Sequence, residues 1–195
     1  VAMGFQNRFN PGVRLLRDAL RDGRFGCVVS LYVRHSSPAP GSPLGWRADP
    51  AGGGWAIGDI GTHLLDISRM LLGELEPVGA RLSSPALGLE VDDVATLLLS
   101  AGDANVVVHA ATAVRGGPSL IELEGTDGWA RLTDFWTGGG TLHTSWGEVL
   151  FEPADSYVEH VGAFARALGG EKWDGSGLAD GVWASRMMKW AAAYD

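Results

Sequence analysis

The sequence predicts an α+β fold built on a mostly antiparallel β-sheet. Runs of alternating or β-branched side chains follow one another through the second half of the chain, separated by Gly, Asp or Pro. The connections between them are short, and residues 101–105 are typical of a hairpin turn, so neighbouring strands should pair antiparallel. The predicted strands in this part are residues 77–84, 93–101, 105–113, 120–126 and 128–133.

Helical patterns precede and follow these strands. A helix is expected over residues 11–21, because Pro11 belongs to its first turn and Gly23 follows its end. The runs 93–101 and 105–113 are largely apolar on both faces, which predicts that both faces of the sheet are covered. The remaining expected elements are a strand at 27–35, shorter strands within 135–152, and helices at about 157–168 and 177–194.

Length, charge and cysteine content narrow the class of protein. With 195 residues the chain fits one large domain, or a domain with an appendage. Its net charge of −8 argues against nucleic acid or an anionic membrane as a partner. We expect neither a membrane-spanning helix nor a signal peptide. Cys27, expected in the strand core, is the only cysteine, which excludes an internal disulfide and fits a reducing, cytoplasmic compartment.

A polar stripe lies on the helix predicted at residues 59–72. Asp59 stands where a helix cap belongs, and a glycine follows the end of the helix. Because a helix turns by about 100° per residue, Asp59, His63 and Asp66 fall on one stripe, beside an apolar stripe that begins at Ile60. The polar trio therefore borders the core instead of facing bulk water.

Two interpretations of this trio are open. In the first, Asp59 is only a cap, His63 is a half-buried core histidine, and Asp66 is its hydrogen-bond partner. In the second, a carboxylate and an imidazole four residues apart hold a hydroxyl group and remove its proton, as general base catalysis requires. The glycine-rich stretch 49–55, which runs into the helix, favours the second interpretation, because glycine lets a backbone approach a ligand.

Several common motifs are missing from the sequence. No G-x-G-x-x-G follows a strand and opens a helix, and neither a Walker-type phosphate loop nor a G-x-S-x-G elbow occurs. A metal site on Asp59, His63 and Asp66 is disfavoured, because this helix supplies only one nitrogen ligand. We therefore expect no metal.

One pattern is specific enough to indicate a family. The pattern G-G-G-x(4)-D-x-G-x-H-x-x-D spans Gly52 to Asp66, and segments beginning GFQNRF, EVDDVA, LIELEG and YVEHVG accompany it in order over nearly the whole chain. In these segments the chain resembles the C-terminal half of the glucose-fructose oxidoreductase, inositol dehydrogenase and rhizopine catabolism (Gfo/Idh/MocA) family. The resemblance implies that residues 1–195 form a substrate-binding and oligomerisation domain, an open-faced sheet with helices packed on one face. It also implies that an N-terminal Rossmann domain, absent from this chain, binds NAD or NADP.

The resemblance further implies roles for the polar stripe. His63 resembles the family's general base, which takes the proton from a substrate hydroxyl while the carbon gives hydride to the nicotinamide. Asp59 looks like the partner that binds the same sugar hydroxyls and keeps His63 oriented. Asp66 is expected to support His63 from behind, away from the substrate.

Four further positions match the family less specifically. Trp46 and Arg47 fall where related enzymes often contact the cofactor. Gln6 and Asn7 fall where related enzymes line the substrate. The substrate implied by the family is a sugar, a polyol or a related hydroxy compound.

The chain departs from the family in its lysines. The family's catalytic lysine lies in a Glu-Lys-Pro segment of the N-terminal half, whereas the only lysines here are Lys172 and Lys189. We therefore expect that this chain alone neither binds a nicotinamide dinucleotide tightly nor turns over substrate.

Three functions stay open at this point. The first is the substrate-binding half of an NAD(P)-dependent oxidoreductase. The second is a non-catalytic binding or scaffold domain that keeps the fold, and the third is an NAD-dependent glycosidase of the same family. In each case we expect a homodimer or tetramer, because strands within 93–113 should pack against a second copy.

Overall fold

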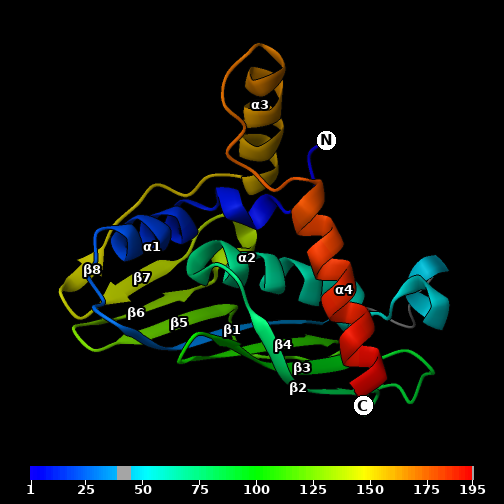
Figure 1. Ribbon diagram of the computed structural model, residues 1–195. Helices are drawn as coiled ribbons and strands as arrows, with labels where there is room; N and C mark the ends of the chain where they lie inside the picture. The colour runs from blue at the N-terminus through cyan, green and yellow to red at the C-terminus, as the bar shows by residue number, and fades with distance from the viewer. Residues whose placement is uncertain (39–44, 195) are drawn as a thin grey trace.

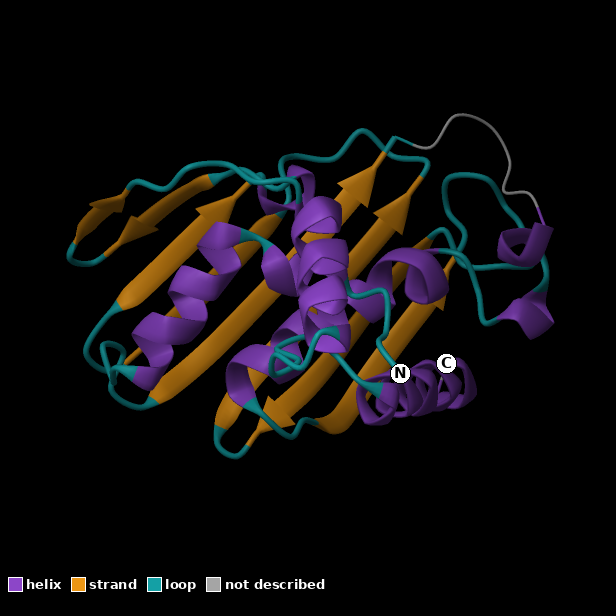
Figure 2. Ribbon diagram, turned by 90° about the horizontal axis from the view of Figure 1, so that it is seen from above, coloured by secondary structure: helices purple, strands orange, loops and turns teal. Residues whose placement is uncertain are grey.

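The computed structural model describes residues 1–38 and 45–194, which form one eight-stranded sheet with helices on one face (Figure 1, Figure 2). The α-helices are α1 (Pro11–Arg21), α2 (Thr62–Leu72), α3 (Ser156–Leu168) and α4 (Leu178–Tyr194). The strands are β1 (Val28–Ser37), β2 (Glu76–Ser83), β3 (Val94–Ala101), β4 (Ala104–Thr112), β5 (Leu120–Gly125), β6 (Trp129–Thr133), β7 (Thr141–Thr144) and β8 (Gly147–Val149). The predicted α+β class is confirmed, and each predicted element is present with ends shifted by a few residues at most.

The order of the strands, β2-β3-β4-β1-β5-β6-β7-β8, explains their directions. Strands β2 to β4 form one antiparallel meander and β5 to β8 another, because each strand pairs with the next one along the chain. Strand β1 lies between the two meanders, parallel to β4 and antiparallel to β5. The ends of β1 and β4 and the start of β5 therefore lie at the same edge of the sheet.

The core lies between the sheet and helices α1, α2 and α4. Alternate residues of the central strands, such as Leu31 and Val33 on β1, are buried on this face. Leu64 and Ile67 of the predicted apolar stripe on α2 are fully buried and belong to the same cluster. Each such side chain contributes about 1.5–3 kcal/mol by leaving water.

The segment before α1 is fixed by one buried asparagine. The side-chain oxygen of Asn10 accepts a hydrogen bond from the Val13 N–H and caps α1, and its side-chain nitrogen donates to the carbonyl oxygens of Phe135 and Gly139. This residue ties the N-terminal segment to the loop after β6.

The other face of the sheet carries no helix among the residues described (Figure 1). Leu98 is 39% exposed on this face, and Val107 is its partner on β4. Beside them the face is polar, because Thr96 Oγ1 and His109 Nδ1 form a 2.9 Å hydrogen bond. The expectation that both runs are apolar on both faces is therefore only partly correct.

The expectation for Cys27 is wrong. Cys27 is exposed and precedes the first residue of β1, so the alternation that buries Leu31 and Val33 does not reach it. In the described part of the chain, no helix is both long enough and apolar enough to cross a membrane. Residues 39–44 of the connection expected after the first strand lie outside the described residues.

Candidate functional site

The predicted polar stripe lies at the start of α2, over the edge of the sheet that holds the end of β4. The chain enters α2 through a π-helical turn, Ala56–Gly61, and Asp59 lies inside this turn. The Asp59 N–H already donates to the Trp55 carbonyl oxygen at 2.9 Å. The prediction that Asp59 caps the helix is therefore wrong, because the helical conformation begins before it.

The cap comes from Asp92, a residue distant in the sequence. Its carboxylate accepts the N–H groups of Trp55 at 3.0 Å and Ile57 at 2.7 Å, and its carbonyl oxygen accepts that of Ala56 at 3.0 Å. Burial raises the pKa of Asp92 to about 6, against the backbone N–H groups that lower it. At Gly54, whose φ is +86°, a Cβ would lie 2.1 Å from Asp92 Oδ1. The glycine makes room for this carboxylate and not for a ligand.

We expect Asp92→Ala to lower the free energy of unfolding by about 2 kcal/mol or more, because it leaves buried backbone N–H groups without an acceptor. Asp92→Asn keeps one acceptor oxygen and should lower the free energy of unfolding by less than Asp92→Ala does. Urea denaturation measures both, with Asp103→Ala in the exposed β3–β4 turn as the control. Equal stability of Asp92→Ala and the control would contradict this assignment.

His63 lies in an aromatic environment. Its ring meets Phe5 at 5.5 Å and Trp136 at 5.6 Å between centroids, both edge-on. Its Nδ1 is buried and has no hydrogen-bond partner among the residues described. Burial lowers the pKa of His63 below 6.5, and the charge of Asp59 opposes this shift. The imidazole is therefore neutral at neutral pH, with a lone pair available to take a proton.

The structure brings three predicted residues together. Asp59 accepts two hydrogen bonds from Arg47, at 2.7 Å from Nε and 3.1 Å from Nη2. The bond to Asp59 raises the pKa of Arg47. The Arg47 guanidinium lies 4.6 Å from the ring centroid of Trp46, whose residue is 48% exposed. Predicted catalytic and cofactor residues thus form one connected group beside His63.

Asp66 does not support His63, so this prediction is wrong. Both of its oxygens accept hydrogen bonds of 2.6 Å from Arg8, and Arg8 also lies 3.1 Å from Asp180. Burial raises the pKa of Asp66 to about 6, while Arg8 lowers it. Asp66 therefore anchors the N-terminal segment to α2.

Gln6 and Asn7 are buried in the short helix Gln6–Phe9, which packs against α2, and the preceding residue, Phe5, contacts the His63 ring. Their amide atoms are unusual: Gln6 Oε1 and both Asn7 amide atoms are buried without partners in the described structure. Buried amides normally find partners, so these groups are available to a ligand or to another part of the protein.

Sequence reasoning missed two residues of this site. His35 stacks on Trp136 with ring centroids 3.9 Å apart and an interplanar angle of 7°. His35 follows Leu31 and Val33 in the alternation of β1, and this spacing could have placed it on the covered face. Trp136 lies in the short helix after β6, and no local pattern pointed to it.

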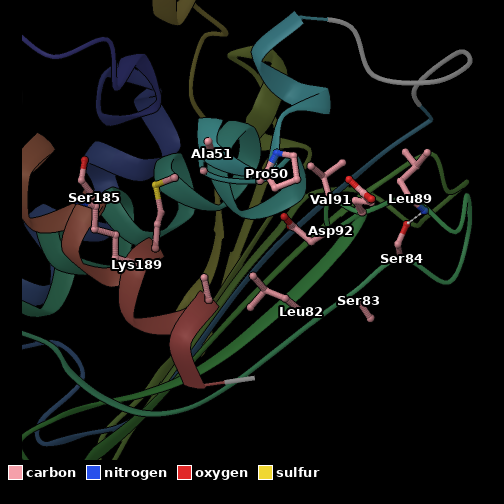
Figure 3. A pocket seen from close by; sticks show the side chains of 15 residues that line it. Pro50, Ala51, Leu82, Ser83, Ser84, Leu89, Val91, Asp92, Ser185 and Lys189 are labelled. Atoms are coloured by element: carbon pink, nitrogen blue, oxygen red, sulfur yellow. Dashed lines mark hydrogen bonds between the residues drawn. The ribbon is translucent and has the colours of Figure 1, made fainter.

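A separate cavity of about 600 Å³ lies between α4, the end of β2 and the glycine loop (Figure 3). Asp92, Leu82, Ser185 and Lys189 line it, whereas His63 does not. The Asp92 carboxylate in this lining already accepts backbone hydrogen bonds from Trp55 and Ile57 at the start of the π-helical turn.

The described residues do not fit the pyrophosphate of a dinucleotide. Such a group needs free N–H donors at the start of a helix. The glycine-rich loop at residues 52–54 leads to N–H groups that the Asp92 carboxylate already occupies, and the Gly177 N–H before α4 donates to Asp180 Oδ2. Trp46 remains exposed enough to contact a cofactor edge. Within the described ranges, no group of three or more His, Cys, Asp and Glu side chains could hold a metal ion.

The fold and the site define a class of protein: an open-faced α+β domain with a histidine and an aspartate at one edge of its sheet. The chain belongs to the GFO/IDH/MocA C-terminal domain family, whose model matches residues 13–131.

Individual relatives agree with this family. Over 156 residues the chain is 32% identical to levoglucosan dehydrogenase from Pseudarthrobacter phenanthrenivorans, a match that covers 65% of this chain and 40% of that protein. The structure of aldose-aldose oxidoreductase from Caulobacter crescentus, complexed with glycerol, superposes with a TM-score of 0.82 and 25% identity, covering 100% of this chain and 61% of that one. A levoglucosan dehydrogenase structure with NADH and levoglucosan gives a TM-score of 0.80 at 24% identity, covering 99% and 64%. The chain spans less than two thirds of each of these proteins.

Proposed function

We propose that this chain is the substrate-binding and oligomerisation domain of a two-domain, NAD(P)-dependent oxidoreductase that oxidises a sugar, a polyol or a related hydroxy compound. The observation that carries the proposal is the environment of His63. Its neutral imidazole is partly enclosed by aromatic rings and lies beside the Asp59 carboxylate. Membership of the family supports it, as do the names of the relatives.

In the proposed reaction, His63 removes the proton of a substrate hydroxyl. A nicotinamide held by another domain would supply a hydride acceptor for the carbon that bears this hydroxyl, so the alcohol would become a carbonyl while His63 would hold the proton. Because this chain has no pyrophosphate cradle among its described residues, the cofactor would be held by a domain outside it.

The neighbouring residues would orient the substrate and stabilise the positive charge of the protonated His63. Asp59 accepts from sugar hydroxyls and stabilises the protonated His63, while Arg47 fixes the Asp59 carboxylate. Gln6 and Asn7 supply amide groups that have no partner in the described structure. Trp46, exposed beside Arg47, would contact the cofactor edge.

The test is the activity of the complete gene product. We expect it to oxidise at least one member of a panel of sugars and cyclitols, with one equivalent of NADH or NADPH formed for each carbonyl product. Cleavage of glycosides without net cofactor reduction would instead identify the glycosidase alternative. Neither reaction with any compound would favour the scaffold alternative and contradict the proposal.

The pH dependence follows from the environment of His63. A base must be unprotonated, and burial holds the pKa of His63 below 6.5, so the acid limb of kcat/KM should lie below pH 6.5. Since Asp59 raises the pKa of His63, Asp59→Asn should shift this limb to still lower pH. A pH–rate profile checks both points; an acid limb above pH 6.5 would count against His63 as the base.

The uncovered face of the sheet is the proposed contact between copies. Leu98 on β3, Val107 on β4 and Tyr32 on β1 lie in one row across this face. Burying this row against a second copy favours an isologous dimer, or a tetramer built from such dimers. Sedimentation of the complete protein should show this at micromolar concentration, and Leu98→Glu should give monomers. We place the protein in the cytoplasm, consistent with its single cysteine.

A further inference from the structure

The ring neighbours of His63 carry a second inference, which rests on the proposed function. His35 follows the fully buried Leu31 and Val33 on the inward-facing side of β1. Its ring lies flat on Trp136, and the rings of Trp136 and His63 meet in a T-shaped contact. His35, Trp136 and His63 therefore form one continuous wall.

Both imidazoles of this wall lack an expected hydrogen bond. His35 Nδ1 and His63 Nδ1 are buried without a partner in the described part of the chain. Buried ring nitrogens are normally paired, and an unpaired one at the edge of a site calls for an explanation such as a bound ligand. Burial, with a smaller contribution from His63, lowers the pKa of His35 to about 4. His35 is therefore neutral at neutral pH, with one ring nitrogen as donor and the other as acceptor.

We propose that His35 is a specificity-determining residue that hydrogen-bonds a second hydroxyl of the substrate, while His63 deprotonates the first. Trp136 is its positioning residue, because the stacked rings fix the plane of the imidazole. The preferred substrate then carries at least two hydroxyls within reach of the wall formed by His35, Trp136 and His63. For a compound without the second hydroxyl, His35 should make no contribution to kcat/KM.

The kinetic test uses the complete gene product and a polyol substrate together with its monodeoxy analogues. His35→Phe keeps a flat ring on Trp136 and removes both nitrogens, so we expect kcat/KM for the full polyol to fall about tenfold or more, mainly through KM. For one deoxy analogue, His35→Phe and the unaltered enzyme should be equal, and His35→Gln should recover part of the loss. The control is His143→Phe on β7, an exposed histidine outside the site.

A direct measurement keeps the inference testable if His35→Phe does not fold. In the unaltered protein labelled with ¹⁵N-histidine, the substrate should shift the ring signals of His35 and His63 but not that of His143. A shift at His63 alone, or equal kcat/KM for His35→Phe and the unaltered enzyme on every compound, overturns the inference and leaves the proposed function standing. An unaltered enzyme that oxidises no sugar or polyol overturns both.

Discussion

Replacing His63 with alanine is expected to lower kcat by about a hundredfold or more in the complete enzyme, with a much smaller change in KM. General bases typically contribute about 10²–10⁴-fold to the rate, because the proton otherwise has to leave to water. Phe5 and Trp136 flank the His63 ring, and His63 is the group that we propose accepts the proton in this aromatic environment. Initial rates of NADH formation at saturating substrate measure the change.

The control for this prediction is His143→Ala, at an exposed position on β7. It should leave kcat unchanged, and thermal unfolding should show that His63→Ala remains folded. A loss in kcat of less than about a hundredfold would contradict His63 as the general base.

Replacing Arg8 with methionine is expected to lower the free energy of unfolding by about 3–5 kcal/mol, because it leaves the Asp66 carboxylate buried and uncompensated. Arg8 lowers the pKa of Asp66, so its removal raises this pKa further above the unfolded value of 3.8. A raised carboxyl pKa gives stability at low pH that is lost as the pH rises through the folded value. The free energy of unfolding that Arg8→Met loses relative to the unaltered protein should therefore be larger at pH 8 than at pH 5.

Two further variants distinguish the effect of breaking the buried Arg8–Asp66 pair from the effect of removing any positive charge. Arg8→Met combined with Asp66→Leu should recover most of the stability, since no unpaired charge then remains at Asp66. Arg166→Met removes the exposed pair with Glu171 and should cost less than about 1 kcal/mol. Urea denaturation at both pH values checks these outcomes. A combined variant no more stable than Arg8→Met alone would show that the charge of Asp66 is not the cause.

The sequence by itself determined the elements and their order. Helix α1 has the predicted bounds, and the strands follow the predicted runs, because side-chain periodicity and turn residues are local signals. The pattern from Gly52 to Asp66 also pointed to the candidate site, since Asp59 and His63 lie one helical turn apart whatever surrounds them.

Only the tertiary structure decided which groups pair with these residues. Asp92 caps the π-helical turn from 35 residues away. Asp66 binds Arg8, 58 residues away in the sequence, and forms no hydrogen bond with His63 in the described structure. His35 and Trp136 meet only because β1 and the segment after β6 end at the same edge of the sheet. Hydrogen bonds and ring stacking depend on distances in space, and strand order sets these distances. Local periodicity therefore reveals which face a side chain occupies but not its partner across the fold.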